Sequence, residues 1–193
     1  MLTAAVRGAA LGSFVAWYAD THGRAGLERA FANVPPGDLS RLDLRKCDFG
    51  IAAADWYPAS VVHRMLDGLL DGLDDCGRSA LAQSAADGSL TSALDGYLGI
   101  VCRAFMSPWA CALVGPRLWR AFYSSGNVSI VADGNRSHVM TVRGWDGHHD
   151  FLCEMNNAAG RAIYRAAGCR SASTEHAACT GRGDRNCTYV IRW

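Results

Sequence analysis

The sequence has little of the features that would point to a charged partner or to a membrane. Its 193 residues carry 19 Lys and Arg against 18 Asp and Glu, and Lys46 is the only lysine. Such a balance gives no electrostatic reason to expect a nucleic acid or an anionic membrane surface as partner. No apolar run reaches the roughly 18 residues that a membrane-spanning helix requires. The sequence therefore predicts a soluble, cytoplasmic protein.

Motifs of the common enzyme classes are also missing. The sequence contains no Ser-His-Asp motif, no phosphate-binding glycine loop and no dinucleotide fingerprint. His148 and His149 lie close to Cys153 in the chain and could in principle activate its thiol. Two adjacent histidines after a Gly-Trp-Asp-Gly turn are, however, more typical of a solvated loop. We therefore expect no catalytic residues and interpret the chain as non-enzymatic.

Length and cysteine usage favour one domain with reduced thiols. A chain of 193 residues, half of them hydrophobic, is long enough for one domain with a real core and short for two. Eight cysteines could form a secreted disulfide framework or could be thiols of an intracellular protein with a metal. A chain that buries this much apolar surface does not need disulfides, so the second interpretation is favoured.

The hydrophobic pattern changes its period near residue 126. Helical spacing dominates residues 1–125, with an apolar stripe over 61–73, further helices over 76–86, 91–106 and 116–123, and breaks at Ser107-Pro108 and Gly115-Pro116. Residues 126–193 alternate as strands at 127–132, 137–143, 172–177 and 187–193, with a helix over 150–167. This order predicts a single α+β domain over 1–193, with helices packed on a small, twisted antiparallel sheet.

Four residues of the second part have the spacing of metal ligands. His176 and Cys179 are three residues apart, and Cys187 follows across a glycine-rich turn that would fold it back beside Cys179. Zinc sites commonly combine thiolates with histidine in this way, and Cys153 could complete a tetrahedron. Glu175 and Cys169 are competing ligands, and buried free cysteines in a sheet would give the same pattern.

The residues that carry this spacing resemble a known family. The ending EHAACTGRGDRNCTYVIRW, residues 175–193, is similar to the C-terminal signature of 4-vinyl reductase domains. Trp56-Tyr57-Pro58, the stretch 116–123 and Leu152-Cys153-Glu154 resemble bacterial proteins of that type. The resemblance implies a fold related to the TRAPP vesicle-tethering subunits. It also implies a structural Zn²⁺ held by Cys153, His176, Cys179 and Cys187, with histidine where the family has glutamate.

The resemblance further implies a sensory or adaptor domain with an apolar pocket. Members characterised as sensors bind a small hydrophobic molecule, commonly form dimers and pass their signal to a partner protein. The candidate pocket residues are the aromatics around the two predicted breaks: Phe105, Trp109, Trp119, Phe122 and Tyr123. They would equally serve as plain core. An enzyme or enzyme subunit acting on a tetrapyrrole- or lipid-like substrate, and an interaction module with a filled pocket, are the alternatives.

Haem is a further alternative, because gas-sensing haem domains have been proposed as distant relatives of this fold. Tyr123-Ser124-Ser125 resembles part of a propionate-binding motif, but the arginine expected shortly afterwards is missing. His63 lies in the helix with the apolar stripe. A position on the polar side of that amphipathic helix explains His63 without a cofactor.

Overall fold

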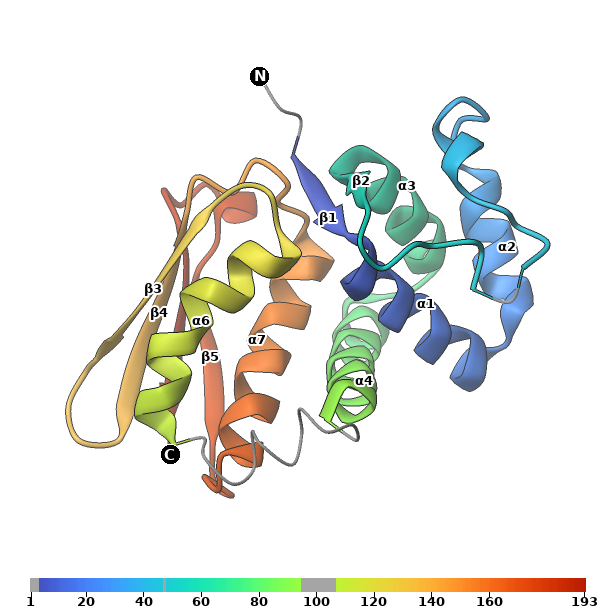
Figure 1. Ribbon diagram of the computed structural model, residues 1–193. Helices are drawn as coiled ribbons and strands as arrows, with labels where there is room; N and C mark the ends of the chain where they lie inside the picture. Colours follow the sequence, from blue (N-terminus) through green and yellow to red (C-terminus); the bar gives the residue numbers. More distant parts are fainter. Residues whose placement is uncertain (1–3, 47, 95–106) are drawn as a thin grey trace.

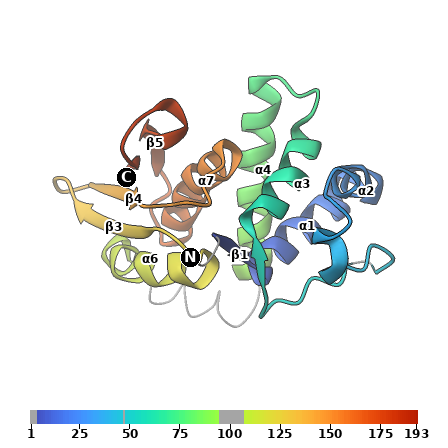
Figure 2. The same ribbon diagram turned by 90° about the horizontal axis from the view of Figure 1, so that it is seen from above.

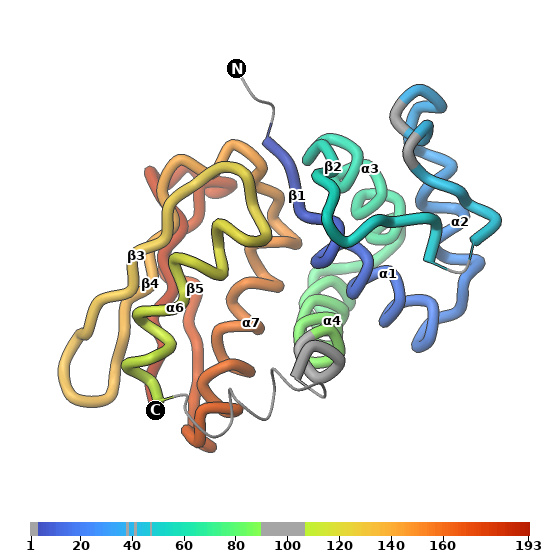
Figure 3. Tube along the Cα trace, in the orientation of Figure 1, coloured from blue at the N-terminus to red at the C-terminus, as the bar shows by residue number. Residues whose placement is uncertain are grey.

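The chain folds into a helical half and a sheet half that pack side by side (Figures 1 and 2). The computed structural model describes residues 4–46, 48–94 and 107–193. We call residues 4–94 the helical half and residues 107–193 the sheet half. The tube in Figure 3 shows that the chain completes the helical half before it enters the sheet half.

The helical half consists of four α-helices and a two-stranded ribbon. The helices are α1 (Gly8–His22), α2 (Arg24–Ala32), α3 (Ala59–Leu70) and α4 (Asp75–Leu94), with a 3₁₀ turn η1 at Asp38–Arg41. The strands β1 (Ala5–Arg7) and β2 (Trp56–Pro58) pair antiparallel. The predicted apolar stripe is confirmed as the buried face of α3: Val61, Val62, Met65, Leu66, Leu69 and Leu70. Spacing of three and four residues places these side chains on one side of a helix, where they form the core of this half.

The sheet half contains four antiparallel strands with two helices on one face. Strands β3 (Asn127–Ala132), β4 (Ser137–Arg143), β5 (Ser173–Ala178) and β6 (Cys187–Arg192) lie in the order β3-β4-β6-β5. The helices are α6 (Pro108–Phe122), which packs on β3, and α7 (Asp150–Ala166), which packs on β5 and β6. The α7 helix also packs along α4 and so joins the two halves. Figure 1 shows α7 between the sheet and α4.

One hydrophobic core runs through both halves. It includes Leu27 and Phe31 of α2 as well as Trp119 of α6 and Tyr189 of β6. A second, smaller cluster lies at the far end of α7 around Tyr164 and Ile191. A continuous core of this kind explains why the chain behaves as one unit, as the α+β prediction requires.

The helix predicted to break at Gly115-Pro116 is continuous. The α6 helix runs through Pro116 from its N-cap Ser107, whose side chain accepts a hydrogen bond from the Ala110 N–H at 3.2 Å. Proline removes one helical hydrogen bond and normally kinks or ends a helix. Here the packing of α6 on β3 compensates: a Cβ on Gly115 would lie 2.5 Å from Cδ1 of Ile130. That break was therefore predicted wrongly, because tertiary contact overrides local preference.

Other helix boundaries also differ from those predicted from the sequence. The helix predicted over 76–86 extends to Leu94 as α4. The prediction over 91–106 falls mostly on residues outside those that the structure describes. Among the helices that are described, none is both long and apolar enough to cross a membrane.

Candidate functional site

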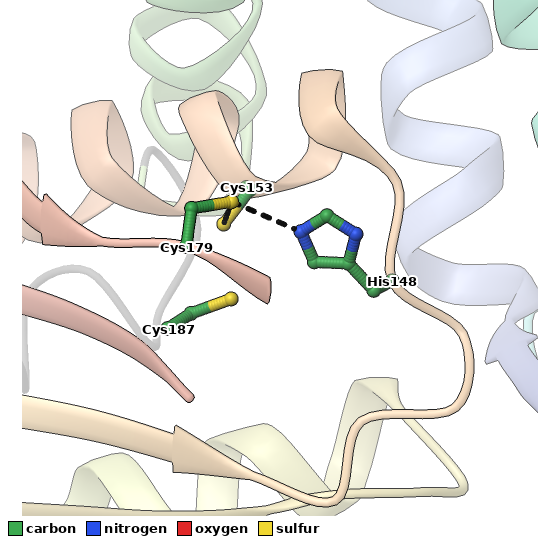
Figure 4. Close-up of side chains that lie close together, drawn as sticks. All are labelled: His148, Cys153, Cys179 and Cys187. Carbon is green, nitrogen blue, oxygen red and sulfur yellow. Dashed lines mark hydrogen bonds between the residues drawn. The ribbon is translucent and has the colours of Figure 1, made fainter. Parts of the chain in front are cut away.

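Three cysteines and a histidine converge where α7, β5 and β6 meet (Figure 4). His148 precedes α7, Cys153 lies in its first turn, Cys179 follows β5 and Cys187 begins β6. The side-chain ligand atoms of these four residues all lie within 4.8 Å of one another. Cys153, Cys179 and Cys187 are buried, and His148 is half-buried.

Local structure explains this convergence. After Cys179 the chain makes a 3₁₀ turn, η2 (Thr180–Arg182), and then reverses at Gly183 with a φ of 91°. Glycine adopts such a positive φ without strain. The backbone N–H of Cys179 donates to the Asp184 carboxylate at 2.8 Å, which closes the turn. Cys187 is thereby brought back beside Cys179, as the sequence predicted.

The helix α7 supplies the other two members of the cluster. The ring of His149 caps this helix by accepting a hydrogen bond from the Phe151 N–H at 3.2 Å. His148 points the other way and places its Nε2 3.3 Å from Sγ of Cys179. One turn into the helix, Sγ of Cys153 lies 3.8 Å from Sγ of Cys179.

Burial keeps the Cys153 and Cys179 thiols protonated at neutral pH. Burial raises the pKa of Cys153 and Cys179, while burial lowers the pKa of His148. The Cys153 thiol also shares a hydrogen bond of 2.8 Å with the Tyr189 hydroxyl. Because the thiolate is the nucleophile and a buried thiol with a raised pKa is inert, the cluster does not have the character of an activated cysteine.

The fourth member of the cluster differs from the predicted one. His176 lies at its margin, with Nε2 3.3 Å from Sγ of Cys153 and its ring stacked on Tyr189 at 4.8 Å between centroids. The group within 4.8 Å contains His148 instead. Of the competing ligands, Glu175 forms an exposed ion pair with Arg192 at 2.9 Å, and Cys169 packs in the second cluster. The assignment of these residues as metal ligands stays a prediction.

His148 was missed because nothing in the sequence places the loop before α7 next to the turn after β5. Only its position five residues before Cys153 could have been a signal. A glycine is needed at the point of contact: a Cβ on Gly181 would lie 3.0 Å from Cε1 of His148 and even closer to the Asp150 carboxylate.

The four predicted pocket aromatics that the structure describes lie in two different environments. Trp119 and Tyr123 pack against each other and against Trp145. The ring centroid of Trp119 lies 4.3 Å from that of Tyr123 and 4.9 Å from that of Trp145. Trp109 and Phe122 are exposed on α6, and Phe105 lies outside the described residues. The structure therefore places two of these side chains in the core and two on the surface.

A cleft of about 640 Å³ opens between the two halves beside the cysteine cluster. Most of its lining is polar and acidic: Asp67, Leu70, Asp71, Asp75, Arg78, His148, His149, Asp150, Phe151, Glu154 and Gly181. His149 bridges the halves by pairing with Asp67 of α3 at 3.2 Å. An apolar ligand normally requires a mainly apolar lining, which this cleft lacks.

Comparison with known proteins identifies the fold. No protein-family model matches the chain, and no curated protein matches it. The unliganded Fe(II) H-NOX protein from K. algicida is similar over 96% of this chain and 95% of that chain, with 13% identity and a TM-score of 0.64. This chain has the H-NOX fold. The S. oneidensis H-NOX protein in its Fe(II)NO state gives 12% identity and a TM-score of 0.63, over 96% and 98% of the two chains.

A third H-NOX domain, described as oxygen binding and related to soluble guanylate cyclases, gives 8% identity and a TM-score of 0.63 over 96% and 94% of the chains. At these identities the similarity concerns the fold. The resemblance to 4-vinyl reductase domains and TRAPP subunits was therefore wrong as a family assignment.

The expectation of a structural Zn²⁺ is also contradicted by these structures. Their metal is Fe(II), and a further match was solved to probe haem distortion in the H-NOX family. We therefore tested whether the described residues of this chain fit a haem.

They do not fit a haem. In the motif-like segment, the Tyr123 ring packs between Trp119 and Trp145, and burial raises the pKa of its hydroxyl to about 12. The Ser124 hydroxyl accepts a hydrogen bond from the Ala5 N–H at 2.7 Å. The His63 ring donates a hydrogen bond from Nε2 to the Gly147 carbonyl oxygen at 3.1 Å. These groups serve the internal structure, and no arginine follows in the motif.

Proposed function

We propose that this chain is a non-enzymatic sensory domain with the H-NOX fold, and that its output is a homodimer formed through the exposed face of α6. The sensory part is supported by the likeness to H-NOX structures over 96% of the chain. Those structures include an Fe(II)NO state and an oxygen complex. The protonated, buried thiols favour this proposal over an enzyme acting on a tetrapyrrole- or lipid-like substrate.

The outward face of α6 supports the second part of the proposal. Trp109, Leu113 and Leu118 are 58%, 76% and 39% exposed, and Val114 and Phe122 are each 36% exposed. Helical geometry puts Trp109 and Leu113 on one stripe of α6 and Val114, Leu118 and Phe122 on a second stripe, while Cys111 and Trp119 are buried. Exposed apolar side chains gathered on one helix in this way are typical of an interaction surface.

A second copy of this chain is the partner that fits this face best. The five side chains named above carry no charge, and the exposed Arg117 and Arg120 that lie among them are long enough to keep their guanidinium groups in water at a two-fold contact. Two-fold interfaces use the same surface on both subunits and are the commonest form of assembly. A small hydrophobic ligand and a partner signalling protein remain predictions that follow from the sensory assignment.

Sedimentation velocity over a range of micromolar concentrations tests the proposal. We expect the parent chain to form dimers and the Leu118→Glu variant to remain monomeric, because the new carboxylate would be buried at the contact and has no arginine three or four residues away on α6 to pair with. Ala25→Glu adds the same charge at an exposed position of α2 and should leave the dimer intact. A parent chain that stays monomeric throughout, or equal dimerisation of both variants, would rule out this output.

A further inference from the structure

We infer that this chain carries the H-NOX fold without haem, its interior closed by its own aromatic side chains, and that it does not respond to the gases bound by its structural neighbours. The inference rests on the fold likeness behind the proposed function and is independent of the dimer. A haem site has three requirements that the described residues do not meet: a free axial ligand, partners for the propionates and an enclosed apolar space.

The first requirement is a free axial ligand. The iron of protein-bound haem is held by histidine, as in globins and peroxidases, or by cysteine, methionine or tyrosine in other haem proteins. All six histidines lie in the described residues, and His22 is exposed at the end of α1. The other five rings each have a polar partner: His63 with Gly147, His138 with Tyr164, His148 with Cys179, His149 with Asp67 and His176 with Cys153.

His138 is the one histidine with a buried free nitrogen. Its Nδ1 lies 2.5 Å from the Tyr164 hydroxyl, whereas its Nε2 is buried without a hydrogen-bond partner. The rings of Trp109 and Trp193 lie 5.2 and 4.8 Å from the imidazole, centroid to centroid. An iron porphyrin bound at Nε2 would have to take the place of these rings.

The second requirement is a cationic or hydrogen-bonding site for two propionates. The Ser124 hydroxyl already accepts a hydrogen bond from the Ala5 N–H, and the Tyr123 ring is packed against Trp119 and Trp145. The cleft between the halves presents the carboxyl groups of Asp67, Asp71 and Asp150, which would repel propionates.

The third requirement is an apolar space, and the chain fills its own interior. Trp119, Tyr123 and Trp145 form a closed trio, with the ring centroids of Tyr123 and Trp145 5.2 Å apart. Phe14 of the helical half meets Phe151 of α7 edge-on at 6.2 Å. These rings belong to one continuous core. Because protein interiors are packed as densely as organic crystals, a porphyrin could enter only by displacing them.

Titration of the purified full chain with haemin, followed by absorption and tryptophan fluorescence, tests the inference. We expect weak, non-saturating association that changes less than twofold in His138→Ala. Addition of carbon monoxide under reducing conditions should leave the melting temperature unchanged. Saturable uptake of one haem per chain with a discrete coordination spectrum would overturn the inference, whichever residue proved to be the ligand.

The outcomes separate this inference from the proposed function. A haem-binding chain that still dimerises through α6 refutes only the haem-free assignment. A monomeric chain that binds no haem refutes only the proposed output.

Discussion

The buried pair His138 and Tyr164 gives a sharp test of the packing described above. Both side chains are almost completely buried, at 0% and 2% exposed, and they share one hydrogen bond. Tyr164→Phe removes that bond and leaves both ring nitrogens of His138 without a partner, since Nε2 already lacks one. His138→Phe in turn leaves the Tyr164 hydroxyl buried and unpaired.

The expected cost follows from the desolvation of unpaired groups. A buried polar atom that loses its partner costs about 1–3 kcal/mol, so each single variant should lose that much of the free energy of unfolding. Replacing both residues by Phe removes every polar atom of the pair, and removing both partners is nearly neutral. The double variant should therefore be about as stable as the parent, with a coupling energy of about −2 to −6 kcal/mol, which is the sum of the two single losses with its sign reversed.

Urea unfolding of the parent, both single variants and the double variant at pH 7.5 measures these differences. The m-value should stay constant, so that shifts of the midpoint report stability alone. Additive losses in the double variant, or a Tyr164→Phe variant as stable as the parent, would show that the two side chains do not form this isolated pair.

The same variants test how the free energy of unfolding depends on pH. Burial lowers the pKa of His138 in the folded chain, whereas in the unfolded chain histidine titrates near about 6.5. As pH falls below that value, the unfolded chain takes up a proton that the folded chain does not. Stability should therefore fall with decreasing pH by at most about 1.4 kcal/mol per pH unit for this residue. The double variant should lack this contribution and overtake the parent between pH 7 and pH 5.

Two further predictions concern packing and thiol access. Gly88→Ala should destabilise the chain by about 1–3 kcal/mol through overpacking, because the new Cβ would collide with the Trp17 ring. At Gly160 the Cβ of an alanine would meet only ordinary contacts, at 3.6 Å and beyond. Gly160→Ala should therefore stabilise α7 by about 0.5–1 kcal/mol. Chemical denaturation of both variants measures whether the two free energies of unfolding change in opposite directions. In timed alkylation mapped by mass spectrometry, exposed Cys76 should react quickly and buried Cys153 only when the chain unfolds; equal rates would contradict the burial of the cluster.

Local patterns in the sequence predicted the elements and three members of the candidate site. The apolar stripe on α3 and the alternation in β3 and β4 depend on neighbours along the chain, so their periods can be read directly. Cys179 and Cys187 come together for a similar reason, because the glycine-rich turn between them fixes their distance.

Features that depend on distant contacts could not be predicted in this way. His148 reaches Cys179 because α7 packs on the sheet beside the turn after β5, and α6 continues through Pro116 where Gly115 lies close against Ile130 of β3. The 4-vinyl reductase resemblance failed for the same physical reason. A short cysteine spacing specifies a turn, whereas the arrangement of helices around it is set by packing over the whole chain.

The most direct test of the account is native mass spectrometry of the purified full chain, produced in cells supplied with a haem precursor and compared with its denatured mass. We predict a polypeptide free of porphyrin, with a dimer among the observed assemblies. A mass increment of one haem per chain that disappears on denaturation would contradict the central claim that this H-NOX fold is closed by its own side chains.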